Sequence, residues 1–189
     1  MTNLATAFDR VPKLVLFGAA ALIQIALIGL MVADRVMILR TGVDVALQTR
    51  PLDPRDFLRG DYVVLGYDIS SVPAGALGAE RTAGRGNPVF VKLAPNRDGF
   101  YEAISVHAAP VDVASPEVLI RGHVVSRGRT LDVRYGIERY FVPEGEGKKL
   151  ENARNQRRLT IVAAVAPTGR AAIKRLLLDG EPVYDEPWF

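Results

Sequence analysis

One uncharged run near the start of the chain, Leu14–Ala33, constrains the fold more than any other stretch. As an α-helix, its twenty residues span roughly 30 Å, about the thickness of the hydrocarbon core of a bilayer. A buried core helix rarely lacks charge over this length. A cleaved signal peptide has an apolar region of only about 7–15 residues that ends at small residues, whereas Met31 is bulky where a small residue is needed. The run therefore predicts an uncleaved transmembrane anchor.

The charges that flank this helix do not decide its orientation. Arg10 and Lys13 precede it, and arginines follow it at positions 35, 40 and 50, so the positive-inside rule gives no clear direction. The segment 1–13 is too short for a domain, and such a tail usually stays inside the cell. We therefore expect a short cytoplasmic tail at 1–13, the anchor at 14–33 and a domain outside the cytoplasm at 36–189.

Composition excludes several classes of function. The chain has no cysteine, which excludes disulfides, thiol chemistry and thiolate zinc sites. Its net charge of +3 is spread along the chain without a dense basic stripe between aromatics, so we expect no nucleic-acid partner. The only two histidines, His107 and His123, fall on the polar faces of predicted strands. A metal site built on them would need carboxylate support, so we expect no metal and no cofactor.

After the anchor, the hydrophobic pattern has a period of two, which is typical of β-strands. Pro95–Gly99 and Arg127–Arg129 are the turns of two predicted β-hairpins, and Asp179-Gly180 is the turn of a third. The run Leu159–Ala166 predicts a central strand, and Lys148–Asn155 predicts the one short helix. The fold class is therefore predicted to be mainly β: an N-terminal transmembrane helix followed by an antiparallel β-rich domain, an open barrel or a sandwich.

Two predicted strands each set one charge into an apolar face. In the stretch that starts at Gly60, alternation puts Asp61 on the same face as Val63, Leu65, Tyr67 and Ile69. In Leu131–Val142, alternation puts Arg139 on the face that ends with Phe141. A buried unpaired charge is costly, so we hypothesise that Asp61 and Arg139 pair. The alternative is that each lies near a strand end and reaches solvent.

The first of these strands carries a family resemblance. Gly60-Asp61-Tyr62, followed by Leu65 and Tyr67, spells the motif of the GDYxxLxY family of membrane-anchored bacterial proteins. Two later segments resemble the family as well: Tyr135–Gly145, and Ala172-Ile173-Lys174 leading to Asp179-Gly180. The resemblance implies a protein of the bacterial inner membrane, of uncharacterised function, and it transfers no catalytic residue. The candidate site residues are the five motif positions and three residues of the second segment: Gly60, Asp61, Tyr62, Leu65, Tyr67, Arg139, Tyr140 and Glu144.

Scaffold roles are the more ordinary interpretation of these residues, and two enzymatic interpretations compete with it. Glu138, Glu144, Glu146 and Glu151 raise the idea of paired catalytic carboxylates, but spacing alone does not show it, because charged residues near glycine-rich loops are mostly solvated. The anchor and β-rich domain also resemble type I signal peptidases. Those enzymes need a serine close to the membrane, and no serine occurs between the anchor and Ser70.

The function predicted from these features is that of an accessory or interaction subunit, with the lipid bilayer and a multi-pass membrane protein as partners. Gln24, in the middle of the anchor, can hydrogen-bond to a partner helix, although a single glutamine is often simply tolerated. The alternative from another class is an envelope hydrolase, or a binder of a small anionic or glycan ligand. A deep pocket would favour that alternative, and an exposed apolar patch would favour the interaction subunit.

Overall fold

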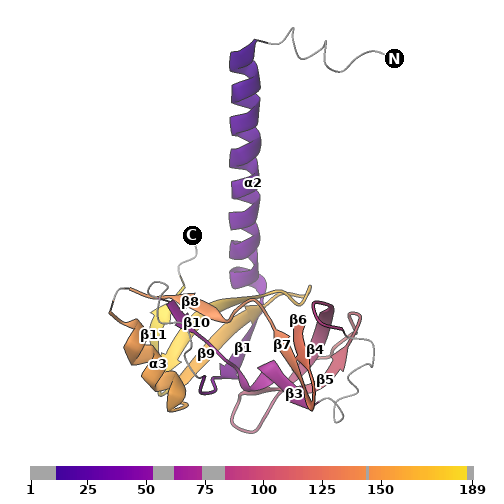
Figure 1. Ribbon diagram of the computed structural model, residues 1–189, viewed down its shortest axis with the longest axis vertical. Coiled ribbons are helices and arrows are strands. Elements are labelled where there is room, and N and C mark those ends of the chain that lie inside the picture. Colours follow the sequence, from indigo (N-terminus) through magenta and orange to yellow (C-terminus); the bar gives the residue numbers. More distant parts are fainter. Residues whose placement is uncertain (1–11, 53–61, 74–83, 144, 187–189) are drawn as a thin grey trace. The chain divides into compact units, whose positions relative to one another are not determined.

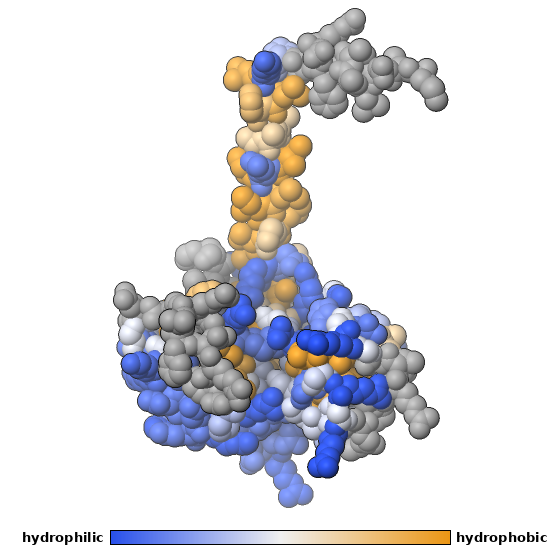
Figure 2. All heavy atoms as spheres, viewed as in Figure 1, coloured by the Kyte–Doolittle hydropathy of each residue, from blue (hydrophilic) through white to orange (hydrophobic). Residues whose placement is uncertain are grey.

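The computed structural model describes residues 12–52, 62–73, 84–143 and 145–186 (Figure 1). The chain divides into two compact units between Met37 and Ile38. The first unit contains most of helix α2 (Lys13–Thr41), which is long and apolar enough to cross a membrane. No residue of its most apolar window is buried within the protein, and Figure 2 shows hydrophobic side chains along its length. The predicted helix is confirmed, and it continues eight residues beyond Ala33.

The junction between helix α2 and the first strand depends on Gly42. Its amide donates to the carbonyl of Ile38 at 2.9 Å. A Cβ at this position would lie 2.6 Å from that same oxygen and 2.9 Å from the backbone nitrogen of Val165. Because both neighbours are backbone atoms, only glycine fits here. The chain therefore passes from helix to strand within one residue.

A four-stranded antiparallel sheet forms one side of the second unit, in the order β1-β9-β10-β11. These strands are β1 (Val43–Gln48), β9 (Leu159–Val165), β10 (Ala171–Leu178) and β11 (Glu181–Asp185). The predicted central position of the strand at 159–166 is confirmed, because β9 lies between β1 and β10. The Asp179-Gly180 hairpin is also confirmed, with φ of 53° and 88° at its turn.

A five-stranded antiparallel sheet has the order β3-β7-β6-β4-β5. Its strands are β3 (Ser71–Pro73), β4 (Pro88–Pro95), β5 (Tyr101–His107), β6 (Val118–Arg127) and β7 (Thr130–Arg134). The two predicted hairpins are confirmed as β4–β5 and β6–β7. A two-stranded ribbon joins β2 (Tyr62–Val64) to β8 (Arg139–Phe141). The short helix α3 (Gly147–Asn155) contacts β2 and β9, and a 3-10 turn, η1, covers Asp68–Ser70.

Both sheets, the ribbon and helix α3 contribute to one hydrophobic core. Alternate residues of each strand point into it, such as Val45 and Leu47 of β1 and Val89, Val91 and Leu93 of β4. Together the sheets form a nearly closed antiparallel arrangement with one short helix, which confirms the predicted mainly β class.

Two predicted strands are shorter than expected. Val63, Leu65, Tyr67 and Ile69 are all buried as predicted, but the strand ends at Val64 and only an isolated bridge follows at Tyr67. The predicted strand at 131–142 is interrupted at Gly136, where φ is +86°. Ile137 is still buried in the predicted phase, but the alternation shifts by one residue before Arg139, so Arg139 is exposed, Phe141 is 79% exposed and Val142 is buried. The predicted place of Arg139 and Phe141 on the apolar face was wrong.

Candidate functional site

The two family-like segments meet in the β2–β8 ribbon. Tyr62 lies opposite Phe141, Val63 opposite Tyr140, and Val64 opposite Arg139. The ribbon continues one step further, where the amide of Leu65 donates to the carbonyl of Glu138 at 2.8 Å. Segments about 75 residues apart in the sequence are thus held together by backbone hydrogen bonds. The hypothesised partner of Arg139, Asp61, lies outside the described residues, as do Gly60 and Glu144, so that pairing stays a prediction.

Two buried tyrosines tie these segments to each other in both directions. Tyr67 is fully buried, and its hydroxyl donates to the carbonyl of Ile137. The hydroxyl of Tyr135 donates to the carbonyl of Ile69 at 2.7 Å. Burial, with the nearby charge of Glu138, raises the pKa of both phenols above the usual value of 10. Both hydroxyls therefore remain donors at physiological pH, and each segment supplies one donor and one acceptor.

The carboxylate of Glu138 holds the turn that interrupts the second segment. It accepts the amide of Tyr135 at 2.5 Å and the amide of Gly136 at 2.9 Å. An ionised carboxylate that bonds to two backbone N–H groups stabilises such a turn. Glu138 was one of the carboxylates considered for acid–base chemistry, and the structure instead gives it a structural role.

Helix α3 places a buried arginine under the ribbon. Arg154 is 1% exposed and shares the inner face of α3 with Leu150 and Ala153. Its guanidinium donates to the carbonyl of Val64, to the carbonyl of Leu52 at 3.3 Å, and to the side-chain oxygen of Asn155 at 2.9 and 3.1 Å. Burial lowers the pKa of Arg154, and the charge of Glu151 opposes this shift.

Arg154 thus joins two points of the backbone, Leu52 and Val64, that flank the segment 53–61. The side chain of Leu52 also packs against Gly66, where a Cβ would lie 2.9 Å from its Cγ. The sequence analysis did not select Arg154. The available signal was an arginine at helical spacing from Leu150, on the apolar face of the predicted short helix.

The outward face of the ribbon is apolar and cationic. Phe141 is 79% exposed and Val64 is 37% exposed, and Arg139 is exposed beside them. Tyr140 points to the other side and is half-buried, with its ring centroid 6.3 Å from that of Tyr184. Burial and a hydrogen bond to the Glu186 carboxylate raise the pKa of Tyr140 to about 12. Of the predicted site residues, Leu65 and Tyr67 are therefore core residues, and Arg139 and Tyr140 reach the surface.

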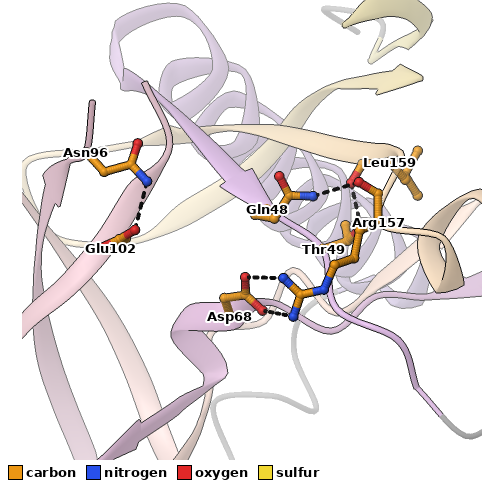
Figure 3. Close-up of polar contacts among 7 residues, drawn as sticks. All are labelled: Gln48, Thr49, Asp68, Asn96, Glu102, Arg157 and Leu159. Carbon is orange, nitrogen blue, oxygen red and sulfur yellow. Dashed lines mark hydrogen bonds and ion pairs between the residues drawn. The ribbon is translucent and has the colours of Figure 1, made fainter. Parts of the chain in front are cut away.

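Polar contacts next to the motif connect it to the start of strand β9 (Figure 3). Thr49, which is buried, donates from its hydroxyl to the carbonyl of Leu159 at 2.5 Å. The carboxylate of Asp68, directly after Tyr67, faces the guanidinium of Arg157 at 3.3 and 3.4 Å. This second pair is exposed, so it contributes little to stability.

The two histidines do not form a common site in the described part of the chain. Nε2 of His107 lies 2.8 Å from the hydroxyl of Ser105, and His123 is exposed on β6. Within the described residues, no three histidine or acidic side chains lie together as metal ligands would.

Replacing Glu138 with alanine is expected to lower the free energy of unfolding by about 1–3 kcal/mol, because the amides of Tyr135 and Gly136 lose their acceptor. Glu138→Gln keeps one acceptor oxygen and should lose less. Thermal unfolding of the full-length protein in detergent, followed by circular dichroism, measures the effect. Glu102→Ala, in the β4–β5 hairpin, is the matched control. Equal losses at both positions would contradict the proposed role of Glu138 in the turn.

Comparison with known proteins identifies the family of this chain. The family model described as GDYXXLXY protein matches residues 24–176. The matched region contains the second part of helix α2, both strands of the ribbon, helix α3 and most of β10. No curated protein matches the chain, and no solved structure matches it. Because the match covers well over half of the sequence, the chain belongs to the GDYXXLXY protein family.

Proposed function

We propose that this protein is a single-pass protein of the bacterial inner membrane that acts as an accessory subunit of a multi-pass membrane protein. In this proposal, residues 1–13 are cytoplasmic, 14–33 cross the bilayer, and 36–189 form the domain outside the cytoplasm. The exposed Phe141 on the motif ribbon is the observation that carries the accessory role.

The anchor is supported by the surface of helix α2. Large apolar side chains are exposed around it, including Leu14, Phe17, Leu22, Ile25 and Met31. In water, such a surface would be a large exposed apolar patch, whereas lipid accommodates it without cost. Gln24 is the polar exception in this stretch, and its amide can bond to a neighbouring helix.

The interaction surface is supported by the outward face of the ribbon. Phe141 and Val64 present apolar area beside the cation Arg139, on a backbone fixed by Arg154 and by the ribbon pairing. Exposed aromatics on rigid elements, next to an arginine, are the side chains that dominate binding energy at protein interfaces. The ribbon therefore suits a partner that offers an apolar pocket with an acidic rim.

The test is co-purification of tagged full-length protein from membranes in mild detergent, with quantitative mass spectrometry. We expect one near-stoichiometric multi-pass membrane protein. Phe141→Ser should reduce its recovery by about tenfold or more, because loss of an interface anchor costs about 2 kcal/mol or more. Ile104→Ser, at a 39% exposed apolar residue of β5, is the matched control and should retain the partner. A clean monomer without any companion would contradict the accessory role.

The orientation of the domain is tested separately, by labelling of an introduced cysteine. This is possible because the chain contains no native cysteine. A single Arg129→Cys substitution puts one thiol into the exposed turn between β6 and β7. In intact cells from which the outer permeability barrier has been removed, a membrane-impermeant maleimide should label this thiol. Labelling only after lysis would contradict the placement of the domain outside the cytoplasm.

A further inference from the structure

A second site lies beside the four-stranded sheet, next to Tyr140 of the motif ribbon, whose hydroxyl bonds to the Glu186 carboxylate. A cavity of about 250 Å³ is lined by Leu39, Lys174, Arg175, Asp185 and Glu186. It is smaller than the roughly 300–1,000 Å³ of pockets for drug-sized ligands, so it suits a small polar group. Leu39 and its neighbour Ile38 are buried against Ala164 and Ala172, which form a separate small apolar cluster beside the cavity.

A β-bulge brings two adjacent cations to this cavity. In a regular strand, Lys174 and Arg175 would point to opposite faces of the sheet. The pairing of β10 with β9 shifts register between Ile173 and Arg175, so that Lys174 is the extra residue. Bulges re-aim side chains and are frequent next to functional sites. Both cations therefore line one cavity, at a position within the third family-like segment of the sequence.

The cavity has both cationic and anionic side chains, and their ion pairs with one another do not take up all of their hydrogen-bonding groups. The ammonium of Lys174 contacts both carboxylate oxygens of Asp44 at 2.8 Å, which leaves one of its three donors. Arg175 uses Nε for its bond to Asp185 at 2.5 Å, and a guanidinium has five donors. Two cations and two carboxylates thus face one space, which fits a ligand that carries both an anionic and a cationic group.

The position of Leu39 along helix α2 indicates that the cavity lies near the surface of a bilayer. Leu39 is six residues beyond Ala33, the end of the uncharged run, and helix α2 is continuous between them. At 1.5 Å per residue, this separation is about 9 Å. The headgroup region on each side of the hydrocarbon core is about 5–8 Å thick. A cavity that contains Leu39 therefore lies near the headgroups, a step that rests on the proposed membrane anchor.

The geometry points to a binding site for the headgroup of a zwitterionic phospholipid with a primary ammonium, phosphatidylethanolamine. The phosphate binds to Lys174 and Arg175, whose planar guanidinium suits phosphate oxygens. The ammonium group binds to the carboxylates of Asp185 and Glu186 with hydrogen bonds that a trimethylammonium group is unable to donate. An anionic headgroup without an ammonium would leave the two carboxylates opposed to its charge.

The test is lipid retention by full-length protein in non-ionic detergent, measured by native mass spectrometry after addition of equal amounts of phosphatidylethanolamine, phosphatidylcholine and phosphatidylglycerol. We expect phosphatidylethanolamine to be retained about tenfold over either of the others. Arg175→Gln should lose about tenfold of this retention, because it removes a charge-assisted bond to phosphate, and Arg175→Lys should recover part of it. Arg158→Gln is the matched control, since it breaks an equivalent pair with Asp179 outside the cavity.

Three outcomes would overturn the assignment. One is equal retention of the three lipids, and another is an equal loss in Arg175→Gln and Arg158→Gln. The third is binding of soluble phosphoethanolamine as tight as that of the lipid, which would identify a free solute as the ligand. Alkaline washing of membranes separates this proposal from the anchor. If the protein stays in the membrane and shows no lipid preference, only the headgroup site is refuted, whereas release of the protein refutes the anchor itself.

Discussion

Replacing Arg154 with alanine is expected to lower the free energy of unfolding by about 3–5 kcal/mol. The substitution removes the donor to the partly buried carbonyls of Val64 and Leu52, each costing about 1–3 kcal/mol when left unsatisfied. It also leaves a cavity under the ribbon, since Arg154 is 1% exposed. In a chain of this size the loss corresponds to a decrease in Tm of about 10 °C. Thermal unfolding of the full-length protein in detergent measures it.

Two further variants separate the hydrogen bonds from the packing. Arg154→Met keeps most of the volume and removes every donor, so it should lose about 2–4 kcal/mol. Arg154→Lys keeps a charge without the planar fork and should fall between wild type and methionine. The control Arg157→Ala breaks only the exposed pair with Asp68 and should cost less than about 1 kcal/mol. If Arg154→Met were as stable as the wild type, the hydrogen bonds from Arg154 to the ribbon would not contribute to the free energy of unfolding.

Replacing Tyr67 with alanine is expected to cost a similar amount, about 3–5 kcal/mol, because this large side chain is fully buried. Tyr67→Phe keeps the ring and leaves the carbonyl of Ile137 without its donor, so about 1–3 kcal/mol is expected. Denaturant titration of both variants checks these values. Tyr101→Phe, at a partly buried tyrosine of β5, is the control and should change the free energy of unfolding by less than about 0.5 kcal/mol.

The decrease in stability at alkaline pH gives an independent measure of the burial of the Tyr67 hydroxyl. Burial raises the folded-state pKa of Tyr67 above 10, so its contribution to stability is fully present below pH 10. Above that value the unfolded phenol ionises first, and the free energy of unfolding falls by up to about 1.4 kcal/mol per pH unit until the folded pKa is reached. Tyr135 adds a second group of the same kind. Tyr67→Phe should therefore show a shallower alkaline decrease, and an unchanged slope would contradict the buried position of the hydroxyl.

The consequence for the motif is that its described positions stabilise the fold. Leu65 and Tyr67 fill the core, and Tyr62 and Val64 pair with the second segment. The surfaces that carry the two proposals, Phe141 on the ribbon and the cavity at Lys174 and Arg175, lie on elements that this core holds in place. Loss of the motif should therefore abolish both partner binding and headgroup binding through unfolding. Phe141→Ser and Arg175→Gln should each affect only one of them.

Local patterns in the sequence determined most of the architecture. The uncharged run predicted helix α2, and the period of two predicted the burial of Val63, Leu65 and Tyr67. Turn residues such as Asp179-Gly180 predicted the hairpins. These features need only residues that are close in sequence, since they follow from helix length, strand alternation and turn geometry.

The tertiary structure decided what depends on contacts between distant segments. The alternation of the second segment shifts by one residue between Ile137 and Arg139, where its pairing with β2 begins, and Phe141 is exposed as a result. The bulge in β10 is set by its register with β9, and it brings Lys174 and Arg175 to one cavity. Arg154 is buried because carbonyls about 90 and 100 residues away accept its donors. A periodic pattern shows which face of an element is apolar, but the partner that satisfies a buried polar group is chosen by the packing of the whole chain.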